Sequence, residues 1–278
     1  MDKVFEQMVS KYQILTDADK LNAYHEVMQV ITLSALQRAG FFNKAAFYGG
    51  TCLRVFYELP RFSEDMDFSL LEVNKGFSLQ DYFPDIVGGF KSVGREVVIT
   101  KKEKKNDTKV ESAFLKDQTE IYNIQFQTEK TVKIKIEVDT YPPLGFETES
   151  KLLLEPFSFM TRCFTLPDLY AGKMHALLFR DWKNRVKGRD WYDFEWYVRK
   201  GIKLNFNHLK LRALQKGFAG EEEDFTVDTF KTLLKEKIQN TSIDQVKRDV
   251  FPFIKDHAGL DIWSIDYFVQ LVDMVQFE

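Results

Sequence analysis

One segment constrains the fold of this chain more than any other: residues 47–70, which read FYGGTCLRVFYELPRFSEDMDFSL. Its glycine pair, Gly49-Gly50, allows a tight turn, because glycine adopts backbone angles that a Cβ atom forbids. Apolar residues at helical spacing predict a short helix over Thr51–Glu58, which ends before a proline. Alternating polar and apolar residues predict a strand over Asp65–Leu70. We therefore expect the segment to fold as strand, glycine turn, helix and strand.

The two acidic residues of this segment indicate its chemistry. Asp65 and Asp67 are two residues apart, so a strand would point both to the same face. Their repulsion favours a divalent cation, and Mg²⁺ binds one or two carboxylates together with phosphate oxygens. The glycine turn before a helix offers free backbone N–H groups and the positive end of the helix dipole, which suit a phosphate. The alternative is a plain turn with solvated acids; the two features in this order favour a nucleotidyl-transfer site.

These residues resemble the first motif of DNA polymerase beta-like nucleotidyltransferases, and in particular that of the AbiEii/AbiGii (MenT-like) toxin family. That motif is a Gly-Gly or Gly-Ser turn followed by R-x-S-x-D-x-D, with Arg61 and Ser63 at its first two positions here. The turn reads Gly49-Gly50-Thr51 in place of Gly-Ser. The resemblance implies nucleotide binding by Gly49, Gly50, Thr51, Arg61 and Ser63.

The resemblance also implies a fold and a division of the chain. The expected class is α+β: a polymerase-beta-like nucleotidyltransferase core, built from a mixed β-sheet with helices, followed by an α-helical C-terminal subdomain. We expect the core over residues 1–160 and the helical subdomain over residues 161–278. In such enzymes the helical part would contribute side chains to the active site.

A third carboxylate is expected from a neighbouring strand. Residues 96–139 have the pattern of a β meander, and its last strand, residues 131–139, has alternating apolar and polar faces. Glu137 and Asp139 share the polar face, so periodicity does not choose between them. The sequence Lys135-Ile136-Glu137-Val138 resembles the second motif of the family, which favours Glu137. Three such carboxylates are the ligand set of a two-metal site.

Two later segments resemble the third and fourth motifs of the family. The helix predicted over residues 168–180 includes Lys173 in the position of the lysine that contacts nucleotide phosphate. The sequence GRDWYDF then presents Asp190 and Asp193, one helical turn apart. The resemblance implies that these acids hold Lys173 or Arg180 in place or steer the acceptor. The alternative interpretation is a pair of acids favoured by the dipole of the helix that they open.

The remaining segments predict ordinary structure. A helix is expected from the Thr16 cap to about Ala39, a plain turn at Gly88-Gly89, and a linking segment up to about Phe164. Residues 201–278 have the pattern of a helical region. The charge run Lys101–Lys105 is typical of a solvated hairpin tip, with contact to an RNA backbone as the alternative.

Bulk properties narrow the function further. The 278 residues have a net charge of −3, so nucleic acid would need a local basic patch. The two cysteines form no disulfide framework, which predicts a cytoplasmic location, and no run is long and apolar enough to span a membrane.

The function that combines these features is Mg²⁺-dependent transfer of an NMP from an NTP to an acceptor hydroxyl, with two Mg²⁺ ions. The resemblance implies an RNA acceptor such as the 3′ end of tRNA, and a cognate antitoxin protein in a toxin-antitoxin or phage-defence system. The alternatives are NMP transfer to a protein or small molecule, phosphotransfer in place of nucleotidyl transfer, or a non-catalytic nucleotide-binding interaction protein. The base of the NTP is not encoded in these motifs.

Overall fold

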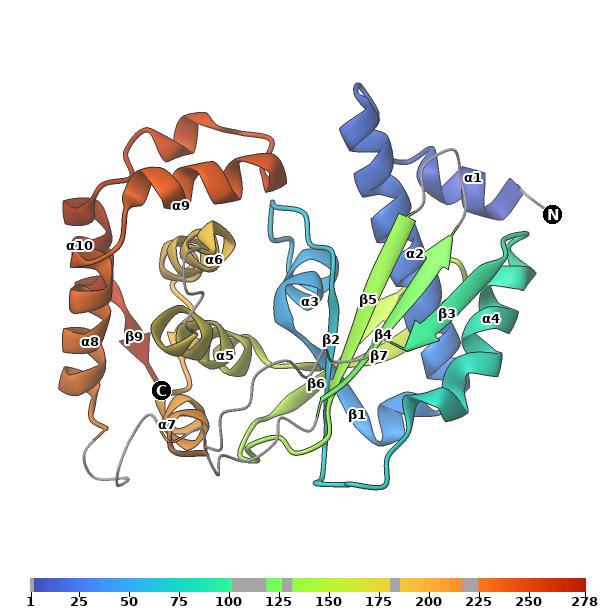
Figure 1. Ribbon diagram of the computed structural model, residues 1–278, viewed down its shortest axis with the longest axis horizontal. Helices are drawn as coiled ribbons and strands as arrows, with labels where there is room; N and C mark the ends of the chain where they lie inside the picture. Colours follow the sequence, from blue (N-terminus) through green and yellow to red (C-terminus); the bar gives the residue numbers. More distant parts are fainter. Residues whose placement is uncertain (1–2, 102–118, 127–131, 181–185, 216, 218–224) are drawn as a thin grey trace, which may run out of the picture. The chain divides into compact units, whose positions relative to one another are not determined.

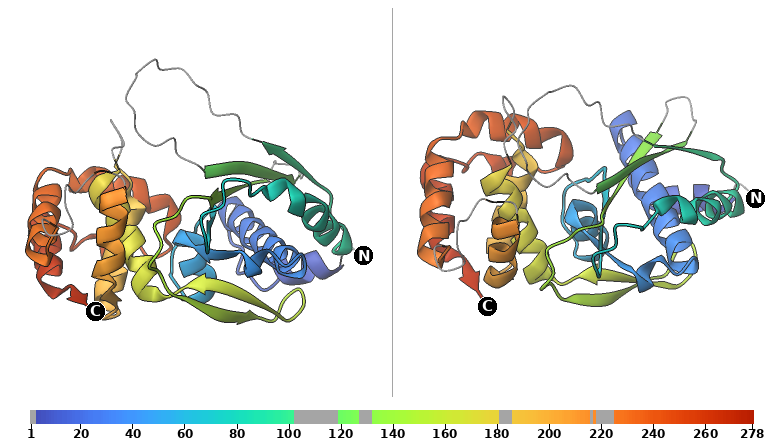
Figure 2. Two further views of the ribbon diagram at one scale, coloured as in Figure 1. Left: turned by 90° about the horizontal axis from the view of Figure 1, so that it is seen from below. Right: turned by 60° about the horizontal axis from the view of Figure 1, so that its bottom comes forward.

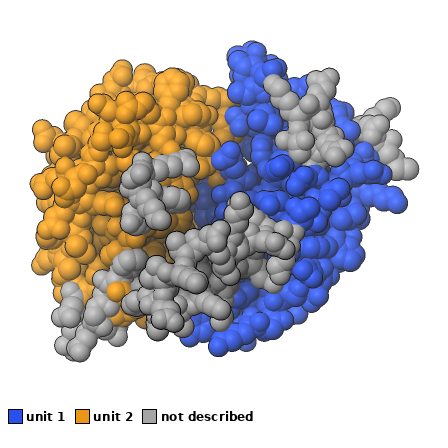
Figure 3. Space-filling model, viewed as in Figure 1, with its two compact units in different colours: residues 1–55, 64–142, 149–163 blue, residues 56–63, 143–148, 164–278 orange. Residues whose placement is uncertain are grey.

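The computed structural model describes residues 3–101, 119–126, 132–180, 186–215, 217 and 225–278. The chain divides into two compact units, coloured separately in Figure 3. Unit 1 comprises residues 1–55, 64–142 and 149–163, and unit 2 comprises residues 56–63, 143–148 and 164–278. The boundary expected at residues 160–161 stays a prediction. All but the first residue of the charge run at 101–105 lies outside the described residues.

Unit 1 is built on a mixed sheet (Figure 1). Within the described residues seven strands form it, in the order β3-β4-β5-β2-β1-β7-β6. Strand β2 pairs in parallel with β5, and β1 pairs in parallel with β7, while β1 and β2 are antiparallel. The strands are β1 Ala45–Tyr48, β2 Met66–Leu70, β3 Val97–Lys101, β4 Thr119–Phe126, β5 Val132–Asp139, β6 Thr148–Leu153 and β7 Phe159–Phe164.

Helices cover this sheet. They are α1 Lys3–Val9, α2 Asp17–Arg38, α3 Gly49–Phe56 and α4 Phe83–Ser92. Helix α2 confirms the helix expected from the Thr16 cap, whose side chain accepts a hydrogen bond from the Asp19 backbone N–H. It packs against α4 and β5. Rings of Phe41 and Phe47 each lie with their centroids 5.0 Å from that of Phe68, so the phenylalanines here form core.

Two expectations about unit 1 were wrong. Gly88 and Gly89 lie inside helix α4 and make no turn. A Cβ on Gly89 would lie 2.8 Å from the Cβ of Ala35, so this glycine lets α4 approach α2 closely. The segment expected to be a linker up to Phe164 instead forms β6 and β7. Strand β7 pairs with β1 through Cys163 and Phe47, a partner far away in the sequence that local patterns do not reveal.

Unit 2 is mainly helical, as expected, and Figure 2 presents it from two further sides. Helix α5 contacts α6 and α7, and α6 contacts α9 and α10. The α+β fold class is thereby confirmed. Among the described residues, no helix is both long and apolar enough to cross a membrane. The elements of unit 2 are α5 Leu166–Phe179, α6 Gly188–Arg199, β8 Lys203–Leu204, α7 Phe206–Gln215, α8 Val227–Gln239, α9 Ile243–Val250, α10 Ile265–Met274 and β9 Gln276–Phe277.

Candidate active site

The turn between β1 and α3 depends on one glycine. Gly49 has a φ of +82°, in the left-handed region that L side chains rarely adopt. A Cβ atom at this position would lie 3.1 Å from the Cβ of Asp67 and would overlap its carboxylate. Glycine therefore permits both the turn and the close approach of Asp67 to the first residue of helix α3.

The two predicted metal-binding aspartates lie beside this turn. Asp65 immediately precedes strand β2, and Asp67 lies within it, paired with Tyr48 of β1. Met66 and Phe68 are fully buried, whereas the side chain of Asp65 is 41% exposed. The alternation expected from the sequence thus directs the apolar side chains into the core and leaves the acids on the polar face.

The neighbouring strand brings a third carboxylate to this face. Parallel pairing of β2 with β5 sets Asp67 opposite Glu137, and Ser69 opposite Asp139. The carboxylate of Asp139 accepts a hydrogen bond from the Tyr141 backbone N–H at 3.0 Å. Glu137 is therefore the acid aligned with Asp67. This register favours Glu137 over Asp139 as the third acid of the site.

A lysine that was not predicted as a site residue lies among these acids. The Nζ of Lys135 is 2.7 Å from Oε1 of Glu137 and 4.0 Å from Oδ2 of Asp65. Burial alone would lower the pKa of Lys135, but the hydrogen bond to Glu137 and the nearby carboxylate charges outweigh it and raise that pKa. Its position two residues before Glu137, on the same strand face, was the signal available in the sequence.

The donor set on this face suits a hard divalent cation. Carboxylate oxygens are the protein ligands that Mg²⁺ prefers, and a cationic ammonium already lies between Asp65 and Glu137. In the part of the chain that the structure describes, no three Asp, Glu, His or Cys side chains are gathered closely enough to form a ready-made metal site. The residues therefore fit the cation by chemistry and strand register, and side-chain rotation would complete the coordination.

Thr51, predicted to bind phosphate, is fully buried in helix α3. Its hydroxyl donates a hydrogen bond to the backbone carbonyl of Asp65. The threonine thus ties the start of helix α3 to the residue that leads into β2. The phosphate-binding role of Gly49, Gly50 and Thr51 stays a prediction, and this hydrogen bond assigns the Thr51 hydroxyl a positioning role.

A second charged cluster lies in unit 2. The guanidinium of Arg61, only 1% exposed, forms a two-pronged ion pair with Asp193: Nε lies 2.5 Å from Oδ1, and Nη2 lies 2.6 Å from Oδ2. Its Nη1 donates to the backbone carbonyl of Phe62 at 2.9 Å. Arg61 therefore makes three hydrogen bonds to two residues of its own unit. Ser63, also predicted to bind nucleotide, is buried two residues further on.

The same cluster includes the predicted phosphate-binding lysine. Lys173 Nζ, on α5, lies 2.7 Å from Oδ2 of Asp193 and 3.2 Å from Oδ1 of Asp190, both on α6. Burial would raise the pKa of Asp193, but Arg61 and Lys173 outweigh it and lower that pKa to about 2. Both acids of the fourth motif thus form ion pairs with Lys173, while the roles that the resemblance implied for these three residues stay predictions.

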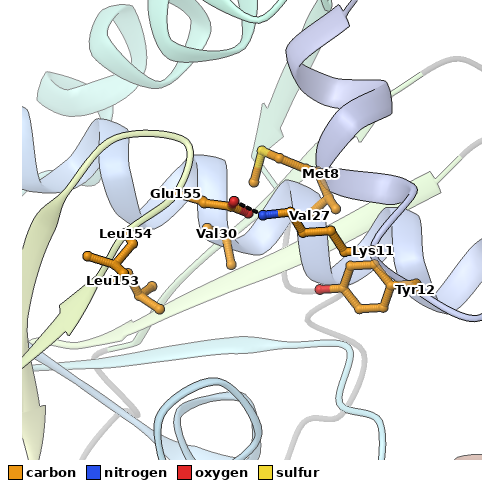
Figure 4. Close-up of a pocket in the computed structure, with 8 residues that line it drawn as sticks. All are labelled: Met8, Lys11, Tyr12, Val27, Val30, Leu153, Leu154 and Glu155. Carbon is orange, nitrogen blue, oxygen red and sulfur yellow. Dashed lines mark hydrogen bonds and ion pairs between the residues drawn. The ribbon is translucent and has the colours of Figure 1, made fainter.

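Unit 1 also contains a cavity that none of these residues lines. It has a volume of about 240 Å³ and lies where α1 and α2 meet the end of β6 (Figure 4). Its walls include Met8, Val27, Val30 and Leu153, together with the ion pair between Lys11 and Glu155. With mostly apolar walls and no acid of the β2–β5 face, it lacks the features of a nucleotidyl-transfer site.

Solved structures from two bacteria are among those that resemble this chain in fold. MenT4, a nucleotidyltransferase toxin from Mycobacterium tuberculosis H37Rv, is 13% identical, with a TM-score of 0.58 and coverage of 99% of this chain and 89% of that chain. JHP933 from Helicobacter pylori is 17% identical, with a TM-score of 0.50 and coverage of 94% and 91%. At these identities the likeness extends to the fold alone.

The comparisons with curated proteins and with family models differ in outcome. No curated protein matches the chain. The family model described as nucleotidyl transferase AbiEii toxin, type IV toxin-antitoxin system, matches residues 31–271. That range includes all four motifs described above. The family predicted from those motifs is therefore confirmed, and this chain belongs to the AbiEii toxin family of nucleotidyltransferases.

Proposed function

We propose that this nucleotidyltransferase uses Mg²⁺ to move an NMP from an NTP to the 3′-terminal hydroxyl of an RNA such as tRNA. The observation that carries the proposal is the parallel pairing of β2 with β5, which aligns Asp67 with Glu137 beside Asp65. These three carboxylates would hold two Mg²⁺ ions. Bound there, the metal would supply charge stabilisation at the reacting phosphate.

The backbone at the start of helix α3 would bind the triphosphate. The first N–H groups of a helix have no partner within the helix, and its dipole favours an anion. The positive φ of Gly49 supports this role, because it lets the helix begin directly against Asp67. Phosphate and carboxylates would thus be held side by side in unit 1.

The reaction itself requires positioning more than covalent chemistry by the protein. The acceptor hydroxyl loses its proton to water and its oxygen attacks the α-phosphorus in line. The bond between that phosphorus and the oxygen bridging to the β-phosphate breaks, and pyrophosphate leaves. We propose that Lys173 offsets charge on the phosphates and that Asp190 and Asp193 keep its ammonium oriented. The Nζ of Lys173 lies 2.7 Å from the carboxylate of Asp193 and 3.2 Å from that of Asp190, which supports this orienting role.

The family implies which kinds of partner this protein has, without naming the individual molecules. A type IV toxin-antitoxin family implies a nucleotide substrate and an antitoxin. We further propose that the antitoxin is a separate protein encoded nearby, and the cytoplasmic location stays a prediction. With a net charge of −3, RNA binding would depend on a local basic surface.

The test is incubation of the full chain with each α-³²P-labelled NTP, Mg²⁺ and total tRNA. We expect label on tRNA from the wild type and none from the Asp65→Ala/Asp67→Ala variant. The matched control is Asp81→Ala/Asp85→Ala, which removes two exposed carboxylates of unit 1 outside this face and should label as the wild type does. Label on protein or on a small molecule, with none on tRNA, would show that the acceptor is not RNA. Release of NDP in place of pyrophosphate would contradict nucleotidyl transfer.

A further inference from the structure

We propose that Lys135 is the resident counter-charge of the carboxylate face and competes with the divalent cation for Asp65 and Glu137. The inference rests on the proposed function, in which these acids bind the cation. It assigns a role to a side chain that stands within the second motif but to which the resemblance gives no function. The consequence is that the carboxylates bind the divalent cation more weakly until the ammonium of Lys135 is displaced.

The strand register explains why this lysine reaches both acids. Lys135 and Glu137 are two residues apart on β5, so their side chains emerge on the same face. Ile136 pairs with Met66 of the parallel strand β2, and Lys135 and Asp65 each precede that pair by one residue. The ammonium therefore lies between an acid of its own strand, at 2.7 Å, and an acid of the next strand, at 4.0 Å.

The surroundings distinguish this contact from an ordinary surface ion pair. An exposed pair is screened by water and contributes little. The Lys135 side chain is only 28% exposed, and that of Glu137 is 24% exposed, so screening is reduced. Lys133, two residues earlier on the same face, is exposed. Lys135 is therefore the lysine of this face whose position lets it neutralise the clustered acids.

The two cations require the same oxygens. A divalent ion needs direct coordination by Glu137 and the aspartates. The ammonium of Lys135 already contacts Oε1 of Glu137, so this oxygen is not free to bind the ion. Binding must break that ion pair and bring a second positive centre close to the first. Both effects weaken binding of the free cation. An anionic ligand that enters with the cation, such as a triphosphate, would receive the displaced ammonium.

The experiment measures binding of Mn²⁺, a probe for Mg²⁺, by the EPR signal of the free ion, with the full chain and no nucleotide. We expect Lys135→Met to bind Mn²⁺ about tenfold more tightly than the wild type, because one nearby positive charge is gone. Lys135→Arg should stay close to the wild type. The matched control Lys133→Met removes a charge from the same strand and face and should change the Kd less than about twofold.

A second readout is thermal melting in EDTA. Without a counter-charge the acids repel, so Lys135→Met should melt at a lower temperature than the wild type in EDTA and gain more from added Mn²⁺. If Lys135→Met does not fold, Lys135→Gln replaces it in both measurements. These two quantities do not require turnover.

The outcomes separate the inference from the function on which it rests. Unchanged or weaker Mn²⁺ binding by Lys135→Met would overturn the inference, while binding by the wild type that Asp65→Ala/Asp67→Ala abolishes would keep the metal site. If the wild type shows no Mn²⁺ binding that depends on Asp65 and Asp67, the proposed metal site fails, and the inference fails with it.

Discussion

The two charged clusters of this protein, one in each unit, combine the same residue types in opposite settings. On the β2–β5 face of unit 1, half-exposed acids have one lysine between them. In unit 2, Asp193 is fully buried and is bound by both Arg61 and Lys173. The difference teaches that charge pattern alone does not define a cation site. Acids with exposed oxygens and a displaceable ammonium between them can accept a metal, whereas acids paired with buried cations hold the fold or another side chain.

The sharpest test of the buried cluster is Arg61→Met. It leaves Asp193 buried with Lys173 as its remaining ion-pair partner among the described residues, and breaking a buried ion pair costs about 3–5 kcal/mol. We expect a loss of that size in the free energy of unfolding, measured by urea denaturation. The control is Arg199→Met on helix α6, whose arginine is 70% exposed and whose partner Glu195 keeps hydrogen bonds from Trp263 and Tyr267. That change should cost less than about 1 kcal/mol. Equal losses would remove the distinction between buried and exposed pairs.

On the exposed face, the corresponding test compares two neutral isosteres, Glu137→Gln and Asp139→Asn. Because Glu137 is aligned with Asp67, its neutralisation should slow nucleotidyl transfer about 100-fold, or about 2.7 kcal/mol, with little change in melting temperature. Asn at 139 can still accept the hydrogen bond from the Tyr141 backbone, so Asp139→Asn should retain activity within a few-fold. Single-turnover rates measure both. The reverse ranking would make Asp139 the third acid.

Acid should unfold unit 2 through its buried aspartates. The pKa of Asp193 is lowered to about 2 in the folded protein, below its ordinary value of 3.8. Because this pKa is lower in the folded than in the unfolded protein, the ionised Asp193 stabilises the fold at pH values above the unfolded pKa. That stabilisation is lost as the pH falls from about 4 toward 2. The loss is about 2 kcal/mol. Melting of the wild type and of Asp193→Asn between pH 5 and pH 2.5 measures it. The variant should depend less steeply on pH; an equal dependence would contradict the role of Asp193.

The clusters also differ in how far the sequence predicted them. The turn at Gly49 and the strand with Asp67 follow from local rules, glycine for a turn and alternation for a strand. The preference for Glu137 comes from the resemblance of the second motif, because alternation alone leaves Glu137 and Asp139 equal. The partner of Arg61 does not follow from local rules, because Asp193 lies 132 positions away in the sequence and nothing local marks the pair as buried. Strand β7 escaped prediction for the same reason, since its partner is the distant β1. Alternation places Lys135 on the same strand face as Glu137, but it does not predict how close Lys135 lies to Asp65 on the neighbouring strand.

The last comparison tests the close approach that gives the exposed cluster its shape. Gly49→Ala adds a Cβ at a φ of +82° and against the Asp67 carboxylate, so it should destabilise the protein by about 1–3 kcal/mol and slow transfer as Asp67 is displaced. The matched control is Gly172→Ala in helix α5, where a Cβ meets nothing within 4 Å. Because alanine loses less backbone entropy than glycine in a helix, that change should stabilise the protein by about 0.5–1 kcal/mol. If the approach of Asp67 to Gly49 shapes the site, urea denaturation of the two variants gives changes of opposite sign, and only Gly49→Ala slows transfer. A Gly49→Ala protein with wild-type stability and rate would show that the turn relaxes without moving Asp67.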